Sequence, residues 1–150
     1  FLFQEQFRMA EKYKKAVIIH GRGVSEKLIG ELKNIWLPYH RRKVVLHCCE
    51  AQKELLEYAK THAGIIGVDG DITYSKAKRD FIKKVPLEML VLETDSPYLL
   101  PEPLRSEKKY PNTPLSLPLI AQAVAEVKGM NVEEVKEVTT RNARELFGLL

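Results

Sequence analysis

Three side chains that can bind a metal ion stand at the ends of short apolar runs. His20 ends the run AVIIH, His47 lies late in KVVLHCC, and Asp95 ends MLVLETD. Imidazole nitrogen and carboxylate oxygen are donors that suit zinc, manganese and similar divalent ions. Together the three predict a divalent-metal site. Taken singly, each histidine also fits a hydrogen-bonded structural role, and Asp95 fits a turn ahead of Pro97.

The elements that must position these residues follow from the alternation of apolar runs and helical patterns. Continuous apolar strands joined by helices form parallel sheets that are covered on both faces. The sequence therefore predicts an α/β fold with four parallel strands, crossover helices and two C-terminal helices. The strands are expected at 16–20, 43–49, 64–69 and 89–95, and the last helices at 119–128 and from 131 to 147. Because parallel strands end at one edge, His20, His47 and Asp95 are expected to meet there.

Other acidic residues lie close to the same edge. Glu93 is two residues before Asp95 and points to the same side of an extended chain, so it is expected to partner a ligand or a basic residue. Asp69 and Asp71 flank Gly70, and turn formation is the expected role of both.

The remaining histidines and the cysteines receive simpler interpretations. His40 and His62 fall in helix-to-strand connections at the opposite edge, and we expect both to face solvent. Cys48 and Cys49 are adjacent, and neighbours on one strand point to opposite faces, so they cannot readily bridge each other. Reduced thiols in a cytoplasmic protein are expected, with a metal role for either as the alternative.

Composition bounds the class of protein. The 150 residues predict a single domain. A net charge of +4 is compatible with a polyanionic partner but does not require one, because Lys and Arg are spread along the chain. No apolar run approaches the ~20 residues that cross a bilayer, and nothing resembles a signal peptide, which indicates a cytoplasmic protein without a membrane partner.

Several segments carry a resemblance to a known family. VIIHGR, VVLHC, IIGVDGDIT, LVLETDSPYLLP, PNTP and TTRNARELFG, in this order, resemble the TatD family of metal-dependent deoxyribonucleases. The resemblance implies an amidohydrolase-like TIM-type (β/α)8 barrel that hydrolyses DNA with one or two divalent ions (Mg, Mn or Zn). It also implies that residues 1–150 form the C-terminal half, strands five to eight, and that the upstream half is missing.

The resemblance assigns roles to individual residues. It implies that His20 and His47 are the metal ligands of the fifth and sixth strands. Asp95 matches the eighth-strand aspartate, which binds metal and orients the attacking water. Arg22 matches a basic position that faces a phosphate, and Asn112 matches the asparagine of a substrate-contacting loop.

The chain also departs from the family pattern. The family's first-strand His-x-His and fourth-strand glutamate are absent, so the fragment alone is expected to lack enough ligands for normal turnover. The usual Cys-Phe-Ser-Gly is replaced by the segment from Cys48 to Ala51, and Glu50 within it is expected to repel a polyanion or recruit an extra metal. Tyr110 and Pro111 stand directly before Asn112, where the family motif has an arginine, so the substrate-contacting motif is not complete in this chain.

Two other functions fit the same residues. One is an amidohydrolase-like hydrolase of a small amide or lactone, because the same ligand set suits that chemistry. The other is a half-barrel without catalysis. A parallel sheet of four strands with two unpaired edges is expected to associate with another copy of itself.

Overall fold

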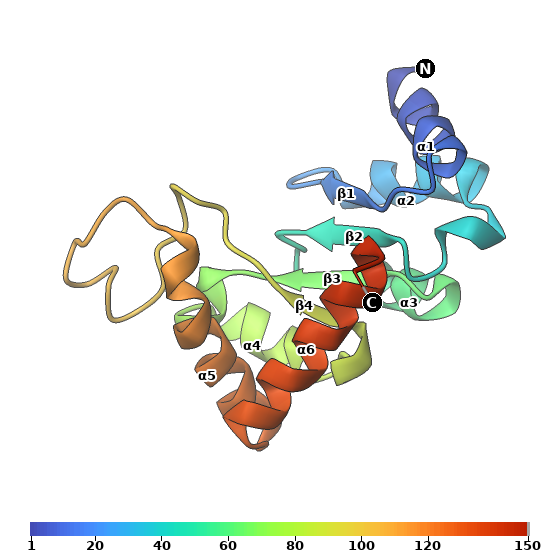
Figure 1. Ribbon diagram of the computed structural model, residues 1–150. Helices are drawn as coiled ribbons and strands as arrows, with labels where there is room; N and C mark the ends of the chain where they lie inside the picture. The colour runs from blue at the N-terminus through green and yellow to red at the C-terminus, as the bar shows by residue number, and fades with distance from the viewer. Residues whose placement is uncertain (150) are drawn as a thin grey trace.

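The chain folds around a parallel sheet whose strands lie in chain order (Figure 1). The computed structural model describes residues 1–149 and contains β1 (Val17–His20), β2 (Val44–His47), β3 (Ile65–Val68) and β4 (Leu90–Leu92). β1 pairs with β2, β2 with β3 and β3 with β4, all parallel. The four strands therefore end at one edge, as the sequence predicts.

Helices connect the strands and complete the chain. The α-helices are α1 (Leu2–Lys12), α2 (Ser25–Ile35), α3 (Lys53–His62), α4 (Lys76–Ile82), α5 (Leu117–Lys128) and α6 (Val132–Phe147). Short 3₁₀ turns are η1 (Pro38–His40), η2 (Gly70–Thr73), η3 (Leu87–Met89) and η4 (Pro114–Ser116). The predicted α/β fold with crossover helices and two C-terminal helices is confirmed. None of the helices within residues 1–149 is long and apolar enough to cross a membrane.

The two faces of the sheet are covered differently. Side chains alternate along each strand, so one face carries residues such as Leu46 and Ile66, which pack with α2, α3, α4 and α5 in the main core. The other face carries a smaller cluster in which Leu146 of α6 packs against the sheet, with Val45, Ile65 and Val91. On β1 this second face is open, since Ile18 is 57% exposed.

The second strand is shorter than predicted. β2 ends at His47, and Cys48 adopts a left-handed conformation with φ 50°. The expectation that both cysteines lie on the strand is wrong, because the Cys48 N–H donates to the Glu93 side chain instead of continuing the ladder. Both thiols are free and buried, as expected for reduced cysteines.

His40 corrects another prediction, since it is buried rather than facing solvent (1% exposed). Its Nδ1 accepts the Leu37 N–H at 2.9 Å, and its ring packs edge-on against Phe7 of α1 at 4.9 Å between centroids. His62 is half-buried and stacks on Tyr58 at 3.9 Å. Both imidazoles belong to an aromatic cluster that packs helices together, a contact that their sequence positions do not reveal.

Candidate metal centre

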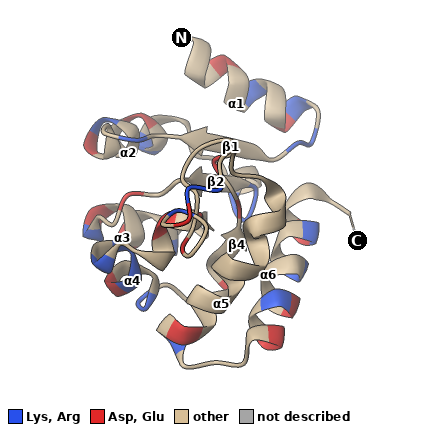
Figure 2. Ribbon diagram, turned by 90° about the vertical axis from the view of Figure 1, so that its left-hand side faces the viewer, with Lys and Arg blue, Asp and Glu red and all other residues tan. Residues whose placement is uncertain are grey.

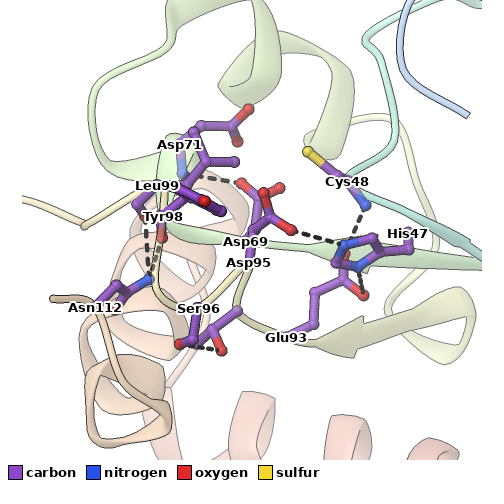
Figure 3. Close-up of polar contacts among 11 residues, drawn as sticks. His47, Cys48, Asp69, Asp71, Glu93, Asp95, Ser96, Tyr98, Leu99 and Asn112 are labelled. Atoms are coloured by element: carbon purple, nitrogen blue, oxygen red, sulfur yellow. Dashed lines mark hydrogen bonds and ion pairs between the residues drawn. The ribbon is translucent and has the colours of Figure 1, made fainter. Parts of the chain in front are cut away.

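His20, His47 and Asp95 converge at the carboxyl edge of the sheet. One donor atom from each lies within 4.8 Å of the others. The pairing of β1 with β2 sets the two histidines opposite each other, with ring centroids 5.1 Å apart. Asp95 arrives from the segment after β4, and its Oδ1 lies 3.3 Å from His47 Nε2 (Figure 3). The structure thus brings together the three residues that the sequence predicts as ligands.

Glu93 fixes the orientation of His47. Its Oε2 lies 2.8 Å from His47 Nδ1, and its Oε1 accepts the Cys48 N–H at 2.7 Å (Figure 3). A metal-binding histidine commonly uses its second ring nitrogen in this way, which sets the ring orientation and raises its basicity. His47 Nε2 is therefore the nitrogen that is directed toward His20 and Asp95.

The position of Glu93 depends on Gly67. Gly67 pairs with Val91 of β4, and Glu93 follows Val91 by two residues, so its side chain leaves the extended chain on the same face as position 67. A Cβ atom at position 67 would overlap the Glu93 carboxylate. A glycine inside an apolar strand often marks such a close approach, and GIIGVD carries this signal.

The substitution Gly67→Ala is expected to push Glu93 away from His47. Overpacking of this kind costs about 1 to 3 kcal/mol of unfolding free energy, measured by urea denaturation. Gly30→Ala is the matched control, because position 30 lies on an exposed part of α2 with nothing within 4 Å of the added carbon. It should stabilise the helix by about 0.5 to 1 kcal/mol. Equal changes in unfolding free energy for Gly67→Ala and Gly30→Ala would contradict the close packing of Glu93 against Gly67.

His47 carries a proton near neutral pH when no metal is bound. The hydrogen bond to Glu93 raises the pKa of His47 to about 9 against the opposing effect of burial, and the charge of Glu93 and the contact with Asp95 add smaller increases. In this state Nδ1–H donates to Glu93 and Nε2–H donates to Asp95. A metal ion at this edge must displace the Nε2 proton, so binding releases a proton.

A buried charged cluster packs against the segment that follows His47. Lys78 of α4 is 4% exposed, and its Nζ donates to the Cys49 carbonyl at 2.6 Å and lies 3.4 Å from Asp71 Oδ2. Asp69 is fully buried, and its Oδ1 accepts the Asp71 N–H at 3.0 Å. The turn role predicted for the aspartates is confirmed, whereas the burial of the lysine does not follow from the sequence pattern.

The two aspartates of this cluster have opposite pKa shifts. Burial and a hydrogen bond with Asp69 raise the pKa of Asp71 to about 7. Burial alone would raise the pKa of Asp69 as well, but hydrogen bonds from Asp71 and the charge of Lys78 hold it below its ordinary value. Near neutral pH the pair therefore shares a proton, and Lys78 balances the remaining charge.

The cysteines are poorly suited to bind a metal. Burial raises the pKa of Cys48 and of Cys49 to about 12. A metal ligand must be the thiolate, which such values disfavour. The alternative metal role for these residues therefore lacks support from their surroundings.

Arg22 and Asn112 occupy different environments. Arg22 is exposed in the loop that directly follows His20. Asn112 is buried, its Nδ2 donates to the Tyr98 carbonyl at 2.7 Å, and its Oδ1 accepts the Ser116 hydroxyl at 2.8 Å. This amide holds the loop after β4 in place, and its predicted contact with substrate stays a prediction.

A parallel α/β sheet with two histidines and an aspartate at its carboxyl edge is typical of metal-dependent hydrolases. Residues 2–148 match the family model described as TatD related DNase, and the chain belongs to this family.

Curated relatives and solved structures agree with this assignment. The chain is 35% identical to the 3'-5' ssDNA/RNA exonuclease TatD of Erwinia amylovora, covering 99% of this chain and 58% of that protein. It is 29% identical to the uncharacterized metal-dependent hydrolase YabD of Bacillus subtilis, covering 97% and 56%. The crystal structure of YJJV, a TatD homologue from Escherichia coli K12, superposes with a TM-score of 0.84 at 31% identity, covering 96% and 54%. The chain thus spans between half and two thirds of the length of these proteins.

Proposed function

We propose that the chain carries the metal-binding edge of a phosphodiester hydrolase that acts on DNA. The observation that carries this proposal is the convergence of His20, His47 and Asp95, with Glu93 bonded to the far nitrogen of His47. The exonuclease name of one relative supports a nucleic-acid substrate. In this proposal β1 to β4 take the places of strands five to eight of a (β/α)8 barrel.

The donor set fits a divalent cation. His20, His47 through Nε2 and a carboxylate oxygen of Asp95 would hold it, and Mg, Mn and Zn all accept such ligands. We propose one or two ions per site. A bound ion would supply Lewis acidity, polarising the phosphodiester and lowering the pKa of water.

The side chains of the chain then perform the remaining chemistry. Asp95 orients a water molecule by hydrogen bonding and accepts its proton at a carboxylate oxygen as the water oxygen attacks phosphorus. The phosphorus–oxygen bond to the leaving nucleotide breaks in the same displacement. Arg22, exposed beside His20, would stabilise the negative charge on the phosphoryl oxygens.

Charges of both signs are mixed along the helices, so we propose that the substrate is recognised at the carboxyl edge of the sheet. Basic and acidic side chains are interspersed along α1, α2 and α6 (Figure 2). The long loop from Ser96 to Thr113 extends on the same side as the strand ends (Figure 1), where it would border a bound strand. Within residues 1–149 the outer edges of β1 and β4 have no partner strand, and we propose that a second copy pairs with them.

The test is release of nucleotides from single-stranded DNA by this chain with Mg²⁺, Mn²⁺ or Zn²⁺ added, and with a chelator as control. We expect slow hydrolysis that requires the ion, since His20, His47 and Asp95 alone are not expected to support normal turnover. A parallel assay with a small amide and a lactone separates the two hydrolase classes. Turnover of those substrates but not of DNA would refute the nuclease, and binding of the ion without any turnover would indicate a half-barrel without catalysis.

A further inference from the structure

The segment from Cys48 to Glu50 contacts chain segments that follow each of the other three strands. It follows His47, and each of its three residues bonds to a different neighbour. The Cys48 N–H reaches the segment after β4, the Cys49 carbonyl reaches α4, and the Glu50 side chain reaches the start of α2. The respective partners are Glu93, Lys78 and the pair Gly23 and Ser25.

The Glu50 carboxylate makes the connection to α2 with both oxygens. Oε1 accepts the Gly23 N–H at 2.7 Å, and Oε2 accepts the Ser25 hydroxyl at 2.6 Å. These hydrogen bonds, with Ser25 contributing most, hold the pKa of Glu50 below its usual range. The carboxylate is therefore ionised at neutral pH, and its hydrogen bonds are of the stronger, charge-assisted kind.

The start of α2 has no side-chain cap of its own. Its N-cap residue is Val24, which has no side-chain oxygen to accept the free N–H groups of the first turn. Gly23 adopts φ 76°, a left-handed conformation in which a side chain is strained. Glu50 bonds to the Gly23 N–H and the Ser25 hydroxyl rather than to those first-turn N–H groups. From the segment after the neighbouring strand it therefore holds the loop that begins directly after His20 and leads into α2.

We infer that Glu50 is a positioning residue of the metal centre. Its carboxylate ties the loop after His20 to the segment after His47, and so fixes the spacing of the two imidazoles. This inference rests on the metal centre proposed above. The expectation that Glu50 repels a polyanion or recruits a metal stays a prediction beside this role, since both of its oxygens accept hydrogen bonds within the protein but its charge remains.

Metal titration of Glu50 variants tests this inference. Binding of Mn²⁺ is measured by calorimetry, and the absorption spectrum of bound Co²⁺ reports the ligand geometry. We expect Glu50→Ala to weaken binding by about 10- to 100-fold and to alter the Co²⁺ spectrum, as changes to residues that orient metal ligands commonly do. Glu50→Gln should restore most of the affinity, because its amide can still accept from Gly23 and donate to Ser25 Oγ.

Glu54→Ala is the matched control, since Glu54 carries the same charge and is exposed in the first turn of α3. An unchanged affinity and spectrum in Glu50→Ala, or an equal loss in Glu54→Ala, overturns the inference. If Glu50→Ala does not fold, Ser25→Ala removes one of the two bonds between Glu50 and the start of α2 and should weaken binding several-fold. No change in binding for Ser25→Ala overturns the inference as well. A wild-type chain that binds neither ion refutes the metal centre itself, a result distinct from normal binding that Glu50 does not affect.

Discussion

Asp95→Asn is expected to reduce metal-dependent hydrolysis of DNA by about 10²- to 10⁴-fold, the range that a general base contributes. Asparagine has the shape of aspartate, so the segment after β4 should keep its fold. The amide, however, carries no negative charge for a cation and accepts no proton from water. The substitution also puts a neutral amide in place of the carboxylate whose Oδ1 lies 3.3 Å from His47 Nε2. The rate should therefore fall together with the affinity for the ion.

The control for this substitution is Asp80→Asn, on α4. Asp80 is an exposed aspartate that pairs with Lys76 of the same helix. Its substitution should leave both the hydrolysis rate and Mn²⁺ affinity unchanged. Equal rates for Asp95→Asn and the wild-type chain would exclude Asp95 as the base and would attribute any observed hydrolysis to another residue or to a contaminant.

The sequence could predict the ligands because their placement follows from local pattern. His20 and His47 end apolar runs, and Asp95 follows one by a few residues. In a parallel sheet such positions meet at one edge whatever the details of packing are. Glu93 precedes Asp95 by two residues, so the alternation of side chains directs it to the same side of the chain. Its role as a partner of a ligand therefore follows from local pattern too.

The supports of the site could not be predicted because they join residues that are distant in sequence. Glu50 and Ser25 are 25 positions apart, and Lys78 and Cys49 are 29 apart. Lysine is rarely buried, so nothing in the α4 pattern distinguishes Lys78 from its exposed neighbour Lys76. His40 is similar, since its burial depends on how α1 packs against η1. The burial and the contacts of these residues are decided by tertiary packing and not by the hydrophobic pattern of the local sequence.

Lys78→Met is expected to lower the free energy of unfolding by about 3 to 5 kcal/mol, the usual cost of removing one partner from a buried ion pair. Methionine replaces the length of the lysine side chain but not its charge. Asp69 and Asp71 would then lack their buried cation, and the Cys49 carbonyl would lose its donor. Urea denaturation at neutral pH measures the loss.

Lys76→Met tests whether the effect comes from burial. Both lysines lie on α4, but the Lys76 side chain is 88% exposed, so its ion pair with Asp80 should contribute little. Adding Asp71→Asn to Lys78→Met should recover part of the stability, because it removes one of the two buried acidic groups left without a cation. Equal stability of the two lysine variants would mean that the buried aspartates are neutral without Lys78. In the wild-type chain Lys78 would then hold the segment after His47 only through its hydrogen bond to the Cys49 carbonyl. The charges of Lys78, Asp69 and Asp71 would not help to position His47.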